Sequence, residues 1–504
     1  MNKQINLKKN TIANYIGQFY TMFIGIFMLP FYIKHLGAEA YGLVGFFTML
    51  TSIMMLLDMG FSQALTRETA KLKDKIGGLF EIKEILRSIE SMILVLAIFI
   101  VIGVFFSTDW IVNQWLQIKV LSYDLVEKSI KLMGFMIAFK WYVSLYNGLI
   151  IGLEQQVWLN IYTIIIATLR FVGGLILILF ISNDIFYFFM YQFIIALFEV
   201  YILNIKVYRN LPKTSFLIPS IINMKKIAPF ALSLAYMSGI WIIYTQLDKL
   251  LLSHYISLHQ YGYFALVVTI STAILQISNP ISQAILPRMT SLLSNGRELE
   301  MLNLYRRGTQ FVSIGMFSVV GIVSFYSYEL LFSWSGNIEA SIWAAPVLFW
   351  YAMGNGILTI LAFQYYLQFA HGNLKYHLRF NTYFPFIALP IVYFAVKNYG
   401  AIGAGITWFG IQLISFLVWP SYVHNKFAPG IHTNWIFQDV FPAFIVTSIY
   451  LIILKILNIQ FDIFNRMEIF GILLIIGIIL LSLNILVYPY TRKIILNKIF
   501  KKRK

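Results

Sequence analysis

Long apolar runs separated by short polar segments make up almost the whole chain. An apolar run of about 20 residues is long enough to cross the hydrocarbon core of a bilayer as an α-helix. We find fourteen such runs, at residues 12–33, 42–66, 91–113, 129–153, 156–181, 187–205, 227–252, 262–285, 308–332, 343–370, 382–396, 401–422, 440–457 and 469–491. The pattern predicts an all-α, polytopic integral membrane protein with about 14 transmembrane helices.

The composition supports this fold class and excludes others. Hydrophobic residues make up 59% of the 504 residues, and charged residues only 12%. Soluble domains carry about 25% charged residues, so the charged residues of this chain are too few to cover a water-facing surface. The absence of cysteine excludes disulfides, iron–sulfur ligation and cysteine nucleophiles. All seven histidines fall outside the runs, and no known metal or phosphate-loop motif is present, so we expect no metal, no cofactor and no catalytic residue.

Basic residues orient the predicted helices. If the N-terminus lies inside, the inside segments hold 28 of the 38 Lys and Arg residues and the outside loops hold five. Such an asymmetry indicates which loops are cytoplasmic, and it places both termini in the cytoplasm. Most of the net charge of +17 therefore reflects topology and not binding to nucleic acid. The basic tail 491–504 is expected to contact anionic lipids of the inner leaflet.

An internal repeat divides the chain. Tyr41-Gly42 is followed by Ser62-Gln63-Ala64, and the same residues recur 220 positions later as Tyr261-Gly262 and Ser282-Gln283-Ala284. An even number of runs separates the copies, so both have the same orientation in the membrane. This predicts two six-helix bundles related by a parallel repeat around a central cleft, at residues 1–226 and 227–430, with two extra helices and the tail at 431–504.

Polar residues form stripes on four of the predicted helices. The first helix carries Asn14 and Gln18, and the eighth carries Gln276, each with further polar residues at helical spacing. Such residues often only join helices to one another. Because the first and second helices correspond to the seventh and eighth under the repeat, the matched stripes favour a hydrated cavity.

Two cations fall near the middle of the predicted membrane. Lys140 and Arg170 each lie roughly 20 Å from the inner boundary, at 1.5 Å per residue. Buried cations need an anion or water, which makes both of them candidates for substrate binding. The alternative is that each pairs with a carboxylate of the same bundle, for which Asp58 and Glu199 are available.

Five further charged residues are candidates at the ends of the runs. Asp58 and Asp248 could couple transport to an ion, although Asp248 and Lys249 could also form an interfacial pair. Lys249 is a candidate for substrate binding as well. Arg67 and Arg288 lie at the predicted inner mouth, where they either capture an anionic substrate or only reflect the positive-inside rule.

The order and spacing of several motifs resemble a known family. The segment from Ile33 to Ala70 is similar to the first hairpin of the polysaccharide-biosynthesis (O-antigen) flippases of the multidrug/oligosaccharidyl-lipid/polysaccharide exporter (MOP) superfamily. The matching elements are Leu36-Gly37, Tyr41-Gly42, Asp58-x-Gly60, and Arg67 with Ala70. The stretch TQLDKLLLSHYISLHQYGYFAL, with Asp248-Lys249, resembles the seventh span of that family, and NYGAIGAG resembles its late glycine-rich turn.

The resemblance implies a function. Members of the family flip an undecaprenyl-pyrophosphate-linked oligosaccharide (an O-antigen or related repeat unit) from the cytoplasmic to the outer leaflet of the bacterial inner membrane. Transport would proceed by alternating access, as a step of polysaccharide or lipopolysaccharide biosynthesis and next to polysaccharide polymerase machinery. A pyrophosphate would suit Lys140 and Arg170. Many members are described with twelve spans, so fourteen runs leave the lipid II flippases and capsule-type exporters as neighbours.

Two other functions remain open. A multidrug/cation antiporter of the same superfamily would carry acidic residues deep in its cavity, whereas the mid-depth residues here are cations. A membrane polysaccharide polymerase or ligase would carry a long basic outer loop, but the longest one, 107–128, holds only Lys119 and Lys128. We therefore expect a transporter and not an enzyme.

Overall fold

The computed structural model describes residues 2–58, 60–213, 221–489 and 492. The predicted membrane contact of the basic tail at 491–504 lies outside the described residues, apart from Arg492. The chain divides by packing into two compact units, Met1–Gly262 and Tyr263–Lys504. The predicted boundaries at 226/227 and 430/431 refer to the sequence repeat and stay a prediction.

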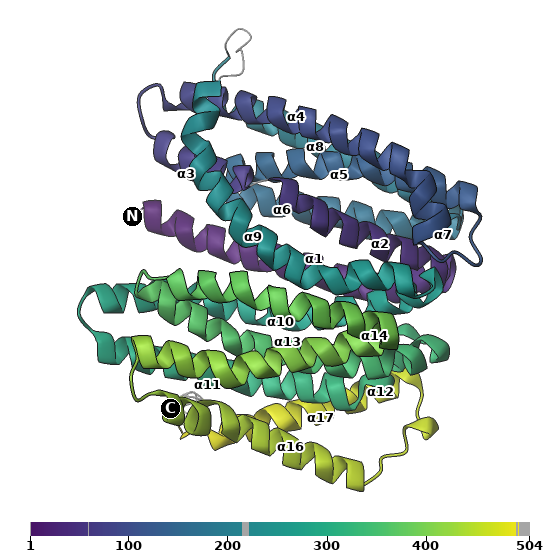
Figure 1. Cartoon of the computed structure of the whole chain (residues 1–504), viewed down its shortest axis with the longest axis vertical. Helices are drawn as coiled ribbons and strands as arrows, with labels where there is room; N and C mark the ends of the chain where they lie inside the picture. The colour runs from purple at the N-terminus through teal and green to yellow at the C-terminus, as the bar shows by residue number, and fades with distance from the viewer. Residues whose placement is uncertain (1, 59, 214–220, 490–491, 493–504) are drawn as a thin grey trace. The chain divides into compact units, whose positions relative to one another are not determined.

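The first unit is built from helices that run along one another (Figure 1). They are α1 (Asn2–Leu36), α2 (Ala38–Met54), η1 (Met55–Asp58), α3 (Phe61–Leu72), α4 (Gly78–Trp110), η2 (Ile111–Trp115), α5 (Tyr123–Gly152), α6 (Gln156–Thr168), η3 (Leu169–Gly173), α7 (Gly174–Phe180), α8 (Ile185–Arg209) and α9 (Ile221–Tyr255). Helix α10 (Leu258–Ser294) begins in this unit and continues into the second.

The core of the first unit lies where α3, α4, α5 and α8 meet. Leu65, Leu86 and Leu145 are fully buried there together with Trp141. The Trp141 indole donates a hydrogen bond to the carbonyl of Met54, 3.0 Å away, which pairs a backbone group at the end of α2. Two of these helices, α5 and α8, carry Lys140 and Glu199, which are discussed below.

The second unit consists of the rest of α10 and the helices that follow (Figure 1). These are α11 (Glu298–Phe325), α12 (Ser327–Ser335), α13 (Ile338–Ala370), α14 (Lys375–Phe427), α15 (His432–Asn434), η4 (Trp435–Val440), α16 (Phe441–Ile456), η5 (Phe461–Ile463) and α17 (Arg466–Val487). Helix α14 contains a bend at Gly400, whose φ of 57° and ψ of −139° are not helical, so it forms two arms.

Helix starts follow ordinary capping chemistry. The side chain of Asp184 accepts a hydrogen bond from the backbone N–H of Phe186 at the start of α8. At the start of α17, Asn465 and Glu468 form a reciprocal capping box. These contacts satisfy N–H groups that have no partner within the helix.

All fourteen predicted runs correspond to helices, and the all-α membrane fold is confirmed. Eleven helices among the described residues are long and apolar enough to cross a membrane. They include α14, whose two arms match the predicted runs 382–396 and 401–422. The other two runs match α9, and α2 with α3. The count of fourteen is therefore approximate, because it depends on how bent helices are divided.

The backbone differs between the two copies of the repeat at the end of α2. In the first copy the helix is interrupted after α2, where Asp58 ends a 3₁₀ turn and Gly60 has a φ of +68°. The equivalent positions in the second copy are Ser278 and Pro280, and α10 continues through them. The side chains of Ser282, Gln283 and Ala284 lie outside the described part of the chain.

Candidate functional site

Lys140 lies in the middle of a membrane-crossing helix. It is on α5, twelve residues before Gly152, which places it roughly 18 Å from that end of the helix. Its side chain keeps 31% of its surface exposed, although its neighbour Trp141 is fully buried. Charged groups are rarely found at this depth of a membrane-crossing helix.

Arg170 lies in an irregular turn at a similar depth. Residues Leu169–Gly173 form a π-helical turn between α6 and α7, within the span from Gln156 to Phe180. A π turn leaves some backbone carbonyls without their normal helical partner, and such turns are frequent at functional sites. Here Tyr32 donates to the carbonyl of Phe171 at 2.6 Å, and Tyr191 donates to that of Leu169 at 2.7 Å.

Glu199 brings the two cations together. This residue of α8 lies next to both basic groups. The Lys140 Nζ is 3.5 Å from its Oε2, and the Arg170 guanidinium donates a hydrogen bond to the same oxygen. The Glu199 and Arg170 side chains are only 10% and 16% exposed. The structure therefore shows the pairing that the sequence offered as the alternative to substrate binding, with Glu199 and not Asp58 as the partner. The three charges sum to +1.

Glu199 lies deeper than the predicted run 187–205 alone implies. If the helix ended at residue 205, Glu199 would be six residues, roughly 9 Å, from the inner end. Helix α8 instead continues to Arg209, ten residues beyond Glu199. At 1.5 Å per residue the carboxylate lies roughly 15 Å from that end, close to the depth of the two cations.

Further polar groups hold the cluster in place. Gln192 donates to the carbonyl of Arg170 at 3.0 Å and accepts from its guanidinium at 3.5 Å. The Tyr162 hydroxyl donates to the carbonyl of Glu199 at 2.9 Å. Gln192 and Tyr162 are not among the residues predicted from the sequence. The signal for Gln192 was its position seven residues before Glu199, which places both on one face of α8.

Asn14 lies against another helix of the same unit, whereas Gln18 is exposed. The Asn160 side chain of α6 donates to the Asn14 side chain at 2.6 Å, so Asn14 joins two helices. Gln18, one turn further along α1, is exposed. Neither residue has a described contact with the three charged groups of the cluster.

Asp58 is buried at the break between α2 and α3. Its carboxylate accepts a hydrogen bond from the Ser62 hydroxyl at 2.8 Å. Among the described side chains no cation forms an ion pair with it. Gly60 allows the turn, because a Cβ at that position would lie 2.7 Å from the carbonyl oxygen of Ala231 in α9. Asp58 is therefore held in a fixed place, and its described hydrogen-bond partner is a neutral hydroxyl.

Asp248 and Lys249 form the ion pair that the sequence offered as one alternative. The Lys249 ammonium is 3.2 Å from the Asp248 carboxylate and donates to the carbonyl of Thr245 at 2.5 Å. Both side chains are largely buried, with 8% and 16% of their surface exposed.

The remaining predicted residues are exposed. Arg67 is exposed and lies 3.8 Å from the Glu68 carboxylate. Gln276 and Arg288 are exposed residues of α10 in the second unit. In the described part of the chain no group of three or more His, Asp or Glu side chains is arranged to hold a metal ion.

Several solved structures share this fold. The lipid II flippase MurJ in an inward closed conformation is 15% identical with a TM-score of 0.74, and the match covers 96% of this chain and 100% of that one. An inward-facing MATE-family multidrug resistance transporter of the MOP superfamily is 13% identical with a TM-score of 0.60, over 82% and 96% of the two chains. A MOP superfamily transporter from Pyrococcus furiosus is 13% identical with a TM-score of 0.57, over 85% and 96%.

These matches define the class of protein as a multi-pass membrane protein with the fold of MOP-superfamily transporters. No curated protein sequence matches the chain. Residues 7–293, more than half of the chain, match the family model described as polysaccharide biosynthesis protein, and the chain belongs to that family. The predicted family is thus confirmed.

Proposed function

We propose that the protein is a flippase for an undecaprenyl-pyrophosphate-linked oligosaccharide, such as an O-antigen or related repeat unit. It would carry this lipid from the cytoplasmic to the outer leaflet of the bacterial inner membrane by alternating access, with both termini in the cytoplasm. Family membership supports a role in polysaccharide biosynthesis. The observation that carries the proposal is the cluster of Lys140, Arg170 and Glu199 at mid-membrane depth.

The cluster solves a physical problem of moving an anion through a membrane. A site for pyrophosphate needs cations, but two unpaired cations in a low-dielectric medium are very costly when the site is empty. Glu199 supplies a resident counter-charge in that state. An incoming pyrophosphate can compete with Glu199 for Lys140 and Arg170, because charge-assisted hydrogen bonds to phosphate have the same geometry as those to a carboxylate.

Lys140 is the residue best placed to meet the ligand first. Its side chain is about twice as exposed as that of Arg170, and its 3.5 Å contact with Glu199 is the longer of the two. In the proposed mechanism Lys140 exchanges its partner, while Arg170 holds Glu199 in place. Arg67 and Arg288 would collect the anionic headgroup at the cytoplasmic mouth. Asn14, Gln18 and Gln276 would contact the sugars. Lys249 would bind the substrate while it remains paired with Asp248.

Ion coupling is assigned to Asp58 in this proposal. The carboxylate is buried, and its described partner is a neutral hydroxyl, so a monovalent cation or a proton could bind there. Asp248 suits this role less well, because Lys249 already neutralises it.

The test is transport of the lipid-linked oligosaccharide in vesicles that contain the full-length protein. Lys140→Ala and Arg170→Ala should each reduce the initial rate by roughly 10- to 100-fold, which corresponds to the loss of a charge-assisted hydrogen bond. Lys140→Arg should retain more activity than Lys140→Ala. The matched control is Lys131→Ala on the same helix. The Lys131 ammonium lies 2.6 Å from the Glu127 carboxylate and does not belong to the cluster. Parental rates for both alanine variants at equal protein levels would rule out the proposed role of the cluster.

A further inference from the structure

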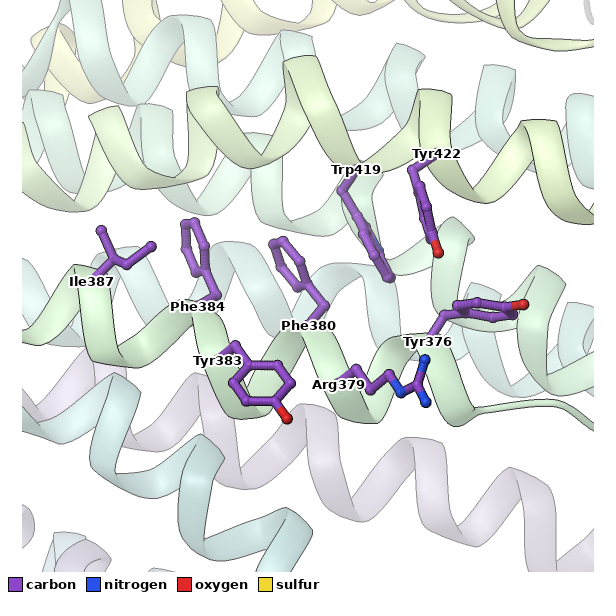
Figure 2. Close-up of a pocket in the computed structure, with 8 residues that line it drawn as sticks. All are labelled: Tyr376, Arg379, Phe380, Tyr383, Phe384, Ile387, Trp419 and Tyr422. Atoms are coloured by element: carbon purple, nitrogen blue, oxygen red, sulfur yellow. The ribbon is translucent and has the colours of Figure 1, made fainter.

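A groove with an unusual lining lies between the two arms of α14. Its volume is about 310 Å³, at the lower end of the range of roughly 300–1,000 Å³ that is typical of ligand sites. Figure 2 shows the residues that form it: Tyr376, Arg379, Phe380, Tyr383, Phe384, Ile387, Trp419 and Tyr422. All of them belong to α14, so the groove is complete within one helical hairpin of the second unit.

Apart from the hydroxyl of Tyr383, the polar groups of the groove lie toward one end. Arg379 is four residues from the start of α14, roughly 6 Å along the helix, and Ile387 is twelve residues from it, roughly 18 Å. The guanidinium of Arg379 and the hydroxyl of Tyr422 lie toward one end in Figure 2, and Phe384 and Ile387 lie toward the other. The polar end is also the end of the hairpin that carries Lys375.

The cation of the groove has no ionic partner in the described part of the chain. Arg379 is exposed, and no described carboxylate forms an ion pair with it. A basic group in this position, at the basic end of a membrane-crossing helix, is complementary to the phosphate of a lipid headgroup.

The aromatic lining favours a hydrocarbon chain over a sugar. The rings of Phe384 and Phe380 stack with centroids 4.8 Å apart, those of Phe380 and Trp419 at 4.3 Å, and those of Trp419 and Tyr422 at 5.7 Å. Because the ring faces are stacked on one another, mostly edges are left for a ligand. A sugar needs a free ring face, whereas an acyl chain can lie along a row of edges.

We propose that this groove binds an anionic phospholipid of the bilayer, with its phosphate at Arg379 and Tyr422 and the start of one acyl chain along Phe380, Phe384 and Ile387. The polarity gradient of the groove matches that of a lipid in a leaflet, from headgroup to chain. A stretch of roughly 12 Å between Arg379 and Ile387 fits the first part of an acyl chain. The proposal is independent of the substrate that the protein transports.

Trp419 provides a direct readout of occupancy. The full-length protein is placed in bilayers that contain phosphatidylglycerol or phosphatidylcholine brominated on the acyl chains, since bromine quenches tryptophan fluorescence at close range. The chain has eleven tryptophans, so the signal of the groove is the difference between the parent and Trp419→Phe. We expect phosphatidylglycerol to quench this signal at about fivefold lower concentration than phosphatidylcholine, the preference that one interfacial arginine supplies.

Two variants test the assignment. Arg379→Gln should abolish the preference for phosphatidylglycerol, and Lys375→Gln, an exposed cation one turn away outside the groove, should keep it. Equal quenching by both lipids in the parent, or an equal loss in both variants, overturns the proposal. If Trp419→Phe does not fold, native mass spectrometry supplies the answer, because Arg379→Gln should then retain fewer phosphatidylglycerol molecules than Lys375→Gln.

A third experiment distinguishes a bilayer phospholipid from the polyprenyl carrier of the transported glycan. Undecaprenyl phosphate is added to the bilayers at the same mole fraction as unlabelled phosphatidylglycerol. If the polyprenyl phosphate relieves quenching more strongly, the groove belongs to the carrier lipid and our assignment is wrong. Equal or weaker relief supports the phospholipid. Neither result bears on transport by the cluster around Lys140, so the two proposals fail separately.

Discussion

Gly42 and Gly262 occupy equivalent positions in the two copies of the repeat and pack directly against each other. A Cβ on Gly42 would overlap the carbonyl oxygen of Leu258 and lie 3.1 Å from the nitrogen of Gly262. A Cβ on Gly262 would overlap the carbonyl oxygen of Ala38 and lie 3.1 Å from the nitrogen of Gly42. Ala38 and Leu258 are also 220 positions apart. The contact is therefore reciprocal: each glycine lies against the residues that are equivalent to its own surroundings in the other copy.

This reciprocity predicts the outcome of a double mutant. Gly42→Ala and Gly262→Ala should each lower the free energy of unfolding by about 1–3 kcal/mol, because α2 and α10 must move apart at this crossing. Once one substitution has separated the helices, the second finds more room, so the double mutant should lose clearly less than the sum. Unfolding in mixed detergent micelles measures the four proteins.

The control for this cycle is Gly103→Ala in α4, where an added Cβ meets no atom within 4 Å. It should leave stability unchanged or slightly raise it, because alanine favours helix more than glycine does. Strictly additive losses at Gly42 and Gly262 would show that the two glycines act at separate contacts.

A second prediction concerns the break at Gly60. An alanine at Gly60 must adopt a left-handed conformation, which costs roughly 1–2 kcal/mol, and its Cβ would also lie 2.7 Å from the carbonyl oxygen of Ala231. Gly77 has a similar φ of +75°, but an added Cβ there meets nothing within 4 Å. We expect Gly77→Ala to lose about 1 kcal/mol and Gly60→Ala at least about 2 kcal/mol more, since only the latter pushes α9 away. Equal losses in an unfolding titration would mean that the packing of α9 on the break contributes nothing.

The sequence predicts those parts of the molecule that depend on local chemistry. An apolar run must be helical in a membrane, because its backbone has no other way to pair its polar groups. For this reason the fourteen runs all correspond to helices, and the repeat could be read from Tyr41-Gly42 and Tyr261-Gly262. The pairing of Asp248 with Lys249 was also accessible, because the two residues are adjacent.

Features that depend on several helices meeting could not be read in the same way. The choice of Glu199 over Asp58 as the partner of Lys140 requires α5 and α8 to pack together, and the depth of Glu199 requires α8 to extend to Arg209. The π turn at Leu169–Gly173 is stabilised by Tyr32 and Tyr191, which come from α1 and α8. The aromatic groove of α14 needs the bend at Gly400, which brings Phe380 onto Trp419.

A third prediction follows from the charge balance of the cluster. Glu199→Gln raises its net charge from +1 to +2 and should lower the free energy of unfolding by about 3–5 kcal/mol, as expected when one partner of a buried ion pair is removed. Adding Lys140→Met returns the net charge to +1 and should recover a large part of that loss. Glu300→Gln is the control, because that carboxylate pairs with Arg297 in an exposed position and should change stability by less than about 1 kcal/mol. A double mutant that is less stable than Glu199→Gln would contradict the view that electrostatic repulsion causes the loss.

The last prediction separates structure from ion coupling at Asp58. In Asp58→Asn the amide oxygen can still accept the hydrogen bond from Ser62, so the break between α2 and α3 should persist and stability should change by no more than about 1 kcal/mol. The negative charge is lost, however, and with it the proposed site for a proton or a monovalent cation. Transport in vesicles should then no longer respond when an ionophore collapses the ion gradient, whereas Ser62→Ala, which keeps the carboxylate, should still respond. If the Asp58→Asn protein remains as sensitive to the ionophore as the parent, coupling does not pass through Asp58.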